Sequence, residues 1–93
     1  KEARRYMELT ALQKAGQIAD LRTQVPYTLI PMQKVPGRKS MRATKYIADF
    51  VYTADGKTVV EDAKGYRDGA AYRLFTLKKK LMYEKYGIYV EEV

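Results

Sequence analysis

The stretch YIADFVYTADGKTVVEDAKG, residues 46–65, decides the fold because it predicts a β-hairpin in the middle of the chain. β-branched and aromatic residues fill 45–53 and 57–63, and the Asp55-Gly56 pair between them is typical of a two-residue turn. Side chains alternate between the faces of a strand, so the even-numbered residues from Tyr46 to Tyr52 are expected to share one face. Both faces are apolar, which predicts a central strand covered on both sides. Asp49 is the polar exception.

The register of this hairpin brings acidic residues together. A two-residue loop places Asp49 opposite Asp62, whereas a three-residue loop places Glu61 there. Either register leaves two carboxylates about 4.5–5.5 Å apart at their Cβ atoms. Their repulsion and lost hydration need compensation by a shared proton, by Lys64 on the same face, or by a divalent cation. The simpler alternative is a salt-bridged hairpin whose acids lie in solvent.

The flanking sequence predicts two helices and two further strands. Residues 1–15 form a helix that ends at Gly16 and carries Glu2 on its inward face, and 18–30 form a strand whose Pro26 favours an edge position. Residues 70–86 form a second helix, which Asp68 could cap and Gly87 ends, and 88–93 form a last short strand. Its expected apolar line is Leu74, Leu77 and Leu81.

These elements predict one α/β domain over 1–93, in the order helix, strand, strand, strand, helix, strand. The first three strands form an antiparallel meander, and the last strand returns parallel through a right-handed crossover. The result is a mixed sheet with helices packed on it, an αβββαβ arrangement of the α+β kind. Residues 31–44, with two prolines and four basic residues, are expected to form a mobile loop.

Composition limits the possible chemistry. The 93 residues include no cysteine and no histidine, which excludes disulfides, thiolate metal sites and histidine bases. Lys and Arg number 18 against 11 for Asp and Glu, so the net charge is +7 and a polyanion is the expected partner. No segment has the length of a membrane span or the pattern of a signal peptide. The residues expected to bind nucleic acid are Arg38, Lys39, Arg42, Lys45, Tyr66 and Lys78.

The motif Asp49…Asp62-Ala63-Lys64 resembles that of the PD-(D/E)XK nuclease superfamily, whose common core also has the αβββαβ order. The strings KEARRYMEL, YIADFVY, VVEDAKG and KKKLMYEKYGI resemble, more narrowly, a phage-encoded family of small uncharacterised proteins placed in that superfamily. Related phage resolvases cleave branched DNA such as Holliday junctions. Ala48 stands where the motif has proline.

The resemblance implies a role for each motif residue. Asp49 and Asp62 are the expected metal ligands, with Glu2 and the carbonyl of Ala63 adding to them, and Lys64 is the expected catalytic lysine. The implied cofactor is Mg²⁺ or Mn²⁺. The chain is then expected to be a metal-dependent endonuclease for branched or double-stranded DNA, a possible homodimer, acting in the cytoplasm of a bacterial host.

Two other functions fit the same sequence. The first is a nucleic-acid-binding module that keeps the fold without the chemistry. The second is a structural protein whose basic surface binds an acidic protein. A cleavage assay in Mg²⁺ or Mn²⁺ separates the nuclease from the nucleic-acid-binding module. A steep salt dependence of DNA affinity would count against the structural protein.

Overall fold

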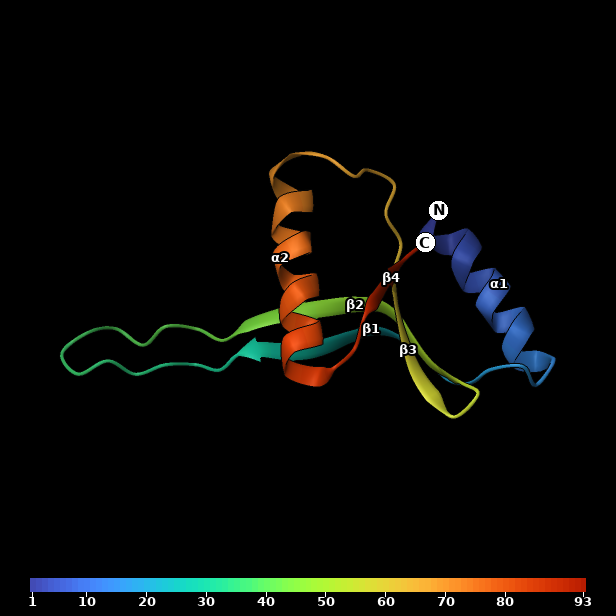
Figure 1. Ribbon diagram of the computed structural model, residues 1–93, viewed down its shortest axis with the longest axis horizontal. Coiled ribbons are helices and arrows are strands. Elements are labelled where there is room, and N and C mark those ends of the chain that lie inside the picture. Colours follow the sequence, from blue (N-terminus) through green and yellow to red (C-terminus); the bar gives the residue numbers. More distant parts are fainter.

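The computed structural model describes residues 1–93 as a twisted four-stranded sheet with two helices packed on it (Figure 1). The elements are α1 (Glu2–Lys14), β1 (Ala19–Ile30), β2 (Thr44–Ala54), β3 (Lys57–Asp62), α2 (Gly69–Tyr86) and β4 (Val90–Glu92). The strand order is β1-β2-β3-β4, with the first two pairings antiparallel and the pairing of β3 with β4 parallel. The predicted mixed sheet and αβββαβ order are therefore confirmed.

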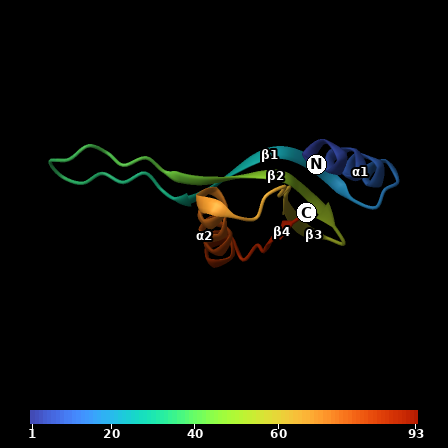
Figure 2. The same ribbon diagram turned by 90° about the horizontal axis from the view of Figure 1, so that it is seen from above.

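The two helices lie on opposite sides of the sheet, as Figure 2 shows. On the α2 side, Phe75 and Met82 pack with Val51, Val60 and Val90 in the larger buried cluster. On the α1 side, Leu9 packs with Phe50 and Tyr52 in a smaller cluster. The prediction for the inner face of α2 holds for Leu81, which packs partly buried against this cluster, but was wrong for Leu74 and Leu77, which are 52% and 54% exposed. Phe75 and Met82 lie seven residues apart, which is two helical turns, and they form the stripe that is covered.

The turn between β2 and β3 has the predicted two residues. Asp55 and Gly56 both adopt positive φ, at 51° and 75°, as the tight hairpin turn requires. Ala54 pairs with Lys57 and Val51 pairs with Val60, which is the register expected for a two-residue loop. The last pair of this ladder is Phe50 with Glu61. Beyond that pair the two strands separate.

The predicted shared face for the even-numbered residues of β2 was wrong. Tyr46 and Ala48 pack in the cluster on the α2 side, but Phe50 and Tyr52 pack in the cluster on the α1 side. The even-numbered residues therefore change face at Asp49. Regular alternation holds only along an uninterrupted extended backbone.

The interruption lies in the neighbouring strand, at Gln24. On β1, Leu21 packs on the α1 side, whereas Val25 and the next odd-numbered residues pack on the α2 side. Gln24 has a left-handed backbone, with φ of 52°, and lies between pairs that place it opposite Asp49. β1 and β2 thus exchange their faces together at one level of the sheet.

β1 is an edge strand, as Pro26 predicted, and it carries a second left-handed residue, Asp20. Beyond its last residue the chain continues into a long arm, residues 31–43, which projects away from the domain (Figure 1). The expected loop is there, but its two sides are joined by a bridge between Gln33 and Met41. Mobility of this segment remains a prediction.

Candidate functional site

Asp62 and Lys64 form an ion pair at the end of β3. Asp62 is only 6% exposed, and its Oδ1 lies 2.9 Å from the Lys64 Nζ. Its Oδ2 accepts a hydrogen bond from the Tyr46 hydroxyl at 2.7 Å. Burial and this hydrogen bond raise the pKa of Tyr46 above its usual range, so the hydroxyl remains a donor. The Lys64 ammonium also lies 3.9 Å from the centre of the Phe75 ring, a cation–π contact.

Asp49 lies where β2 and β3 separate, after the pair of Phe50 with Glu61. We call Asp49 and the segment Asp62-Ala63-Lys64 the fork. Its Oδ2 accepts the backbone N–H of Ala63 at 2.8 Å, so the side chain bonds to the neighbouring strand just beyond the last ladder pair. Ala63 is the residue between Asp62 and Lys64 in the chain. The structure therefore brings Asp49 to the Asp62-Ala63-Lys64 segment, as the predicted register requires.

Glu2 reaches the same place from α1, through a residue that the sequence analysis missed. The Gln24 Nε2 donates to the Glu2 Oε2 at 3.2 Å and to the Asp49 Oδ1 at 3.3 Å. One amide nitrogen thus lies between two carboxylates from different elements. No motif marks Gln24, and its left-handed backbone can be seen only in the structure.

Glu61, the other acid considered opposite Asp49, lies on the α1 side. It pairs with Phe50 across the hairpin and takes a bidentate contact from the Arg5 guanidinium, at 2.8 and 2.6 Å. The Tyr52 hydroxyl donates a further short hydrogen bond to it. Burial alone would raise the pKa of Glu61, but the bonds from Arg5 and Tyr52 outweigh it and hold that pKa below 4.5. Glu61 therefore holds α1 on the sheet through Arg5.

The donors around the fork have the right chemistry for a hard cation. Asp49, Asp62, Glu2 and the Ala63 carbonyl all offer oxygen atoms, which Mg²⁺ and Mn²⁺ prefer. No group of three or more acidic side chains is drawn together into a ready cluster. The carboxylate oxygens of Asp49 and Asp62 instead accept hydrogen bonds within the chain. A cation would have to take up free lone pairs or replace Gln24 and Lys64 as partners.

The residues predicted to bind nucleic acid fall in three places. Arg38, Lys39 and Arg42 lie on the arm, and Lys45 follows it on β2, all of them exposed. Lys78 lines a hollow of about 240 Å³ on the α2 side, together with Asp62 and Lys64. Tyr66 follows β3 and is 73% exposed. Lys78 therefore lies beside the ion pair, whereas the arm residues lie away from it.

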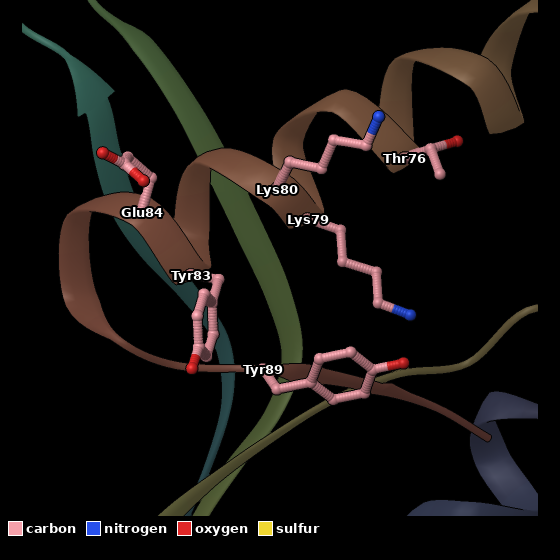
Figure 3. A pocket seen from close by; sticks show the side chains of 6 residues that line it. All are labelled: Thr76, Lys79, Lys80, Tyr83, Glu84 and Tyr89. Carbon is pink, nitrogen blue, oxygen red and sulfur yellow. The ribbon is translucent and has the colours of Figure 1, made fainter.

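A larger hollow, of about 400 Å³, is lined by α2 and by Tyr89, which follows this helix (Figure 3). In this view Lys79 extends toward Tyr89, and its ammonium lies 4.3 Å from the centre of that ring. The same ammonium lies 2.8 Å from the Glu92 carboxylate, which also accepts from the Tyr72 hydroxyl. These contacts fasten β4 to α2. None of the residues predicted for metal or nucleic acid lines this hollow.

The chain is a small α+β domain, and it belongs to the family described as "Protein of unknown function (DUF1064)", whose model matches residues 1–91. The comparisons with curated proteins and with solved structures give no match. Neither helix combines the length and apolar character needed to cross a membrane.

Proposed function

We propose that this protein is a divalent-metal-dependent endonuclease that hydrolyses phosphodiester bonds in DNA, with branched DNA as its substrate. The observation that carries the proposal is the fork itself. Asp49 bonds to the backbone of Ala63, and the residues on either side of Ala63 are the buried Asp62 and its partner Lys64. A pair of aspartates with an adjacent lysine is a suitable set of groups for phosphodiester hydrolysis.

Each residue of the fork has a part in this reaction. Asp49 and Asp62 would hold Mg²⁺ or Mn²⁺, with Glu2 and the Ala63 carbonyl as further oxygen donors. The bound cation supplies polarisation of the scissile phosphate and a more acidic water. Lys64, released from the Asp62 Oδ1, would hydrogen-bond the attacking water and the non-bridging phosphate oxygens. Water would attack the phosphorus in line with the leaving oxygen, the bond from phosphorus to that oxygen would break, and the proton lost by the water would pass through solvent to the leaving oxygen. Phe75 keeps the ammonium in place before substrate arrives.

The substrate follows from charge and size. A net charge of +7 favours a phosphate backbone as partner. A domain of 93 residues offers by itself little surface for reading a long sequence, which favours recognition of DNA structure by this domain. A homodimer would allow paired cuts in two strands of a junction. We place the activity in the cytoplasm of a bacterial host, in keeping with the resemblance to phage-encoded proteins.

The direct test is cleavage of a four-way junction and of a linear duplex of the same composition, in Mg²⁺ or Mn²⁺. Wild-type protein should cut the junction faster, and Asp49→Asn should cut neither, while its DNA affinity in EDTA is unchanged. Asp55→Asn is the matched control, because it makes the same chemical change at an exposed turn residue outside the fork. Equal loss of cleavage in both variants would contradict the assignment.

A second readout does not depend on activity. A cation that binds the folded chain raises its melting temperature with concentration. Titration with Mn²⁺ should therefore stabilise the wild type and Asp55→Asn, and have little effect on Asp49→Asn. The same titration without any shift in the wild type would leave the fork without a cation and overturn the metal-dependent mechanism.

One observation favours the non-catalytic module as the second candidate. The acidic side chains of the fork already have protein donors, including the Gln24 amide between Glu2 and Asp49. If the wild type binds junction DNA but cuts none of it in either metal, the module is the correct function. Affinity would then fall steeply with salt and would be equal for wild type and Asp49→Asn.

A further inference from the structure

The arm, residues 31–43, contributes nothing to the packing of the domain. None of its residues belongs to either buried cluster, and positions 31–42 are all exposed. Its form depends on its own hydrogen bonds: Gln33 and Met41 exchange two backbone bonds of 2.9 and 2.8 Å, and Arg38 N–H donates to the Val35 carbonyl at 3.0 Å. Ordering such a segment costs conformational entropy that no core contact offsets. We therefore expect the arm to act in binding a partner.

The charge of the arm identifies the chemistry of its partner. The cations are Lys34, Arg38, Lys39 and Arg42, with Lys45 directly after them, and positions 31–45 contain no acid. Positions 69–83 also hold four cations and no acid, but one of those cations, Lys79, pairs with Glu92. None of the cations of positions 31–45 forms an ion pair. A protruding segment with cations on both of its sides suits a partner that presents phosphates on both of its sides.

The shape of the arm suits a groove of duplex DNA. Two paired strands lie about 4.8 Å apart, and a two-stranded ribbon fits the major groove, which is about 12 Å wide, whereas the minor groove is about 6 Å wide. Beside its cations the arm exposes apolar side chains, including Met32, Val35 and Met41. Apolar groups of this kind make contact with the methyl group of thymine in the major groove.

The reach of the arm connects it to the fork. Asp49 lies on β2, twelve positions along the chain from Gly37 at the tip of the arm. At about 3.3 Å a residue, this path spans up to about 40 Å. One turn of B-DNA is about 34–36 Å long. A duplex whose phosphate lies at Asp49 would thus present its next major groove to the tip.

We propose that the arm enters the major groove of duplex DNA about one helical turn from the fork, with Arg38 and Lys39 on the flanking phosphates and Val35 against the base edges. The inference rests on the proposed function in taking DNA as the partner. It extends that function by assigning the arm to the duplex beside the site of cleavage, which makes the arm a positioning element for the substrate.

The test measures binding to a four-way junction whose arms are each about three turns long, in EDTA so that cleavage does not occur; the branch point fixes where the protein binds. Dimethyl sulfate reports access to guanine N7 in the major groove. Wild-type protein should protect a short run of guanines, and the double variant Arg38→Ala with Lys39→Ala should lose that protection. The slope of log affinity against log salt should fall by about two, at roughly 0.9 for each lost phosphate contact. The matched control is Lys14→Ala with Lys57→Ala, which removes two exposed cations away from the arm.

A second variant removes the tip itself, with an Asn-Gly turn in place of residues 34–40, and circular dichroism checks that it folds. It should bind more weakly than the double variant and protect no guanine N7. Unchanged slope and protection in the double variant would overturn the proposal, as would protection confined to the minor groove. This result is separate from the nuclease test. Cleavage by a protein whose arm is dispensable would overturn only the arm proposal, and arm-dependent binding without cleavage would overturn only the nuclease.

Discussion

Glu61 and Asp62 are consecutive on β3, yet they are held by different halves of the molecule. Glu61 is bound by Arg5 of α1, whereas Asp62 is bound by Tyr46 and Lys64 on the α2 side. Because side chains alternate along the strand, these two chemically similar acids face opposite sides of the sheet. Glu61 holds α1 in place, and Asp62 is a candidate catalytic residue. The first predictions follow from this division.

Loss of the Glu61 carboxylate should destabilise the fold. Glu61→Ala leaves the Arg5 guanidinium and the Tyr52 hydroxyl without their shared partner, and we expect it to lower the free energy of unfolding by about 3 kcal/mol. Urea denaturation measures the change. Glu8→Ala is the control, because Glu8 contacts the same guanidinium from an exposed position and should cost at most about 0.5 kcal/mol. Similar costs for both variants would contradict the anchoring role.

The same group predicts a pH dependence. The folded pKa of Glu61 lies below its usual 4.5, so the unfolded chain takes up this proton first as the pH falls. The stabilisation is complete above pH 4.5 and is lost as the pH drops below it through the folded pKa. The difference in unfolding free energy between wild type and Glu61→Gln should therefore be constant at neutral pH and shrink in acid. A difference that stays constant to the lowest pH at which both fold would exclude this linkage.

The left-handed backbone at Gln24 predicts an unusual order of stability. A residue with a Cβ atom pays about 1 kcal/mol in this conformation that glycine avoids. Gln24→Gly should therefore be more stable than Gln24→Ala by about that amount, although both lose the amide between Glu2 and Asp49. Thermal unfolding measures the two. At Gln33, whose φ is not positive, the order should be reversed.

The two apolar stripes of α2 should differ in cost. Phe75→Ala leaves a cavity in the larger cluster and removes the ring beside Lys64. We expect it to lower the free energy of unfolding by about 3–4 kcal/mol. Leu74→Ala changes an exposed residue and should stay within about 0.5 kcal/mol of the wild type. Chemical denaturation of the pair checks which stripe is covered. A large loss at Leu74 would instead indicate a partner on that face.

What the sequence could predict was set by local chemistry. Asp55-Gly56 specified the turn and hence the register, Asp68 caps α2 by accepting from the Gly69 N–H, and Gly87 ends that helix in the left-handed conformation. The inner stripe of α2 was not predictable in this way, because both of its stripes are apolar at helical spacing. Which one is covered depends on the sheet beneath it.

The candidate site was also predictable only in part. The register alone brought Asp49 next to the Asp62-Ala63-Lys64 segment. The choice between Glu61 and Asp62 depended on their partners, which are Arg5 of α1 for Glu61, and Tyr46 of β2 with Lys64 for Asp62. Gln24 had no signal at all, because its position follows from the relation between two strands. The exchange of faces by the residues of β1 and β2, at Gln24 and Asp49, was unpredictable for the same reason, because it too depends on how the two strands pair.

The irregular backbone of β1 also has a consequence for self-association. Within seven residues this outer strand carries two left-handed residues, Asp20 and Gln24, and then Pro26, which has no N–H to donate. Such an edge offers a poor template for a strand of another molecule, so sheet-to-sheet polymerisation and amyloid growth from β1 are discouraged. Two copies of this chain should therefore not join their sheets through β1.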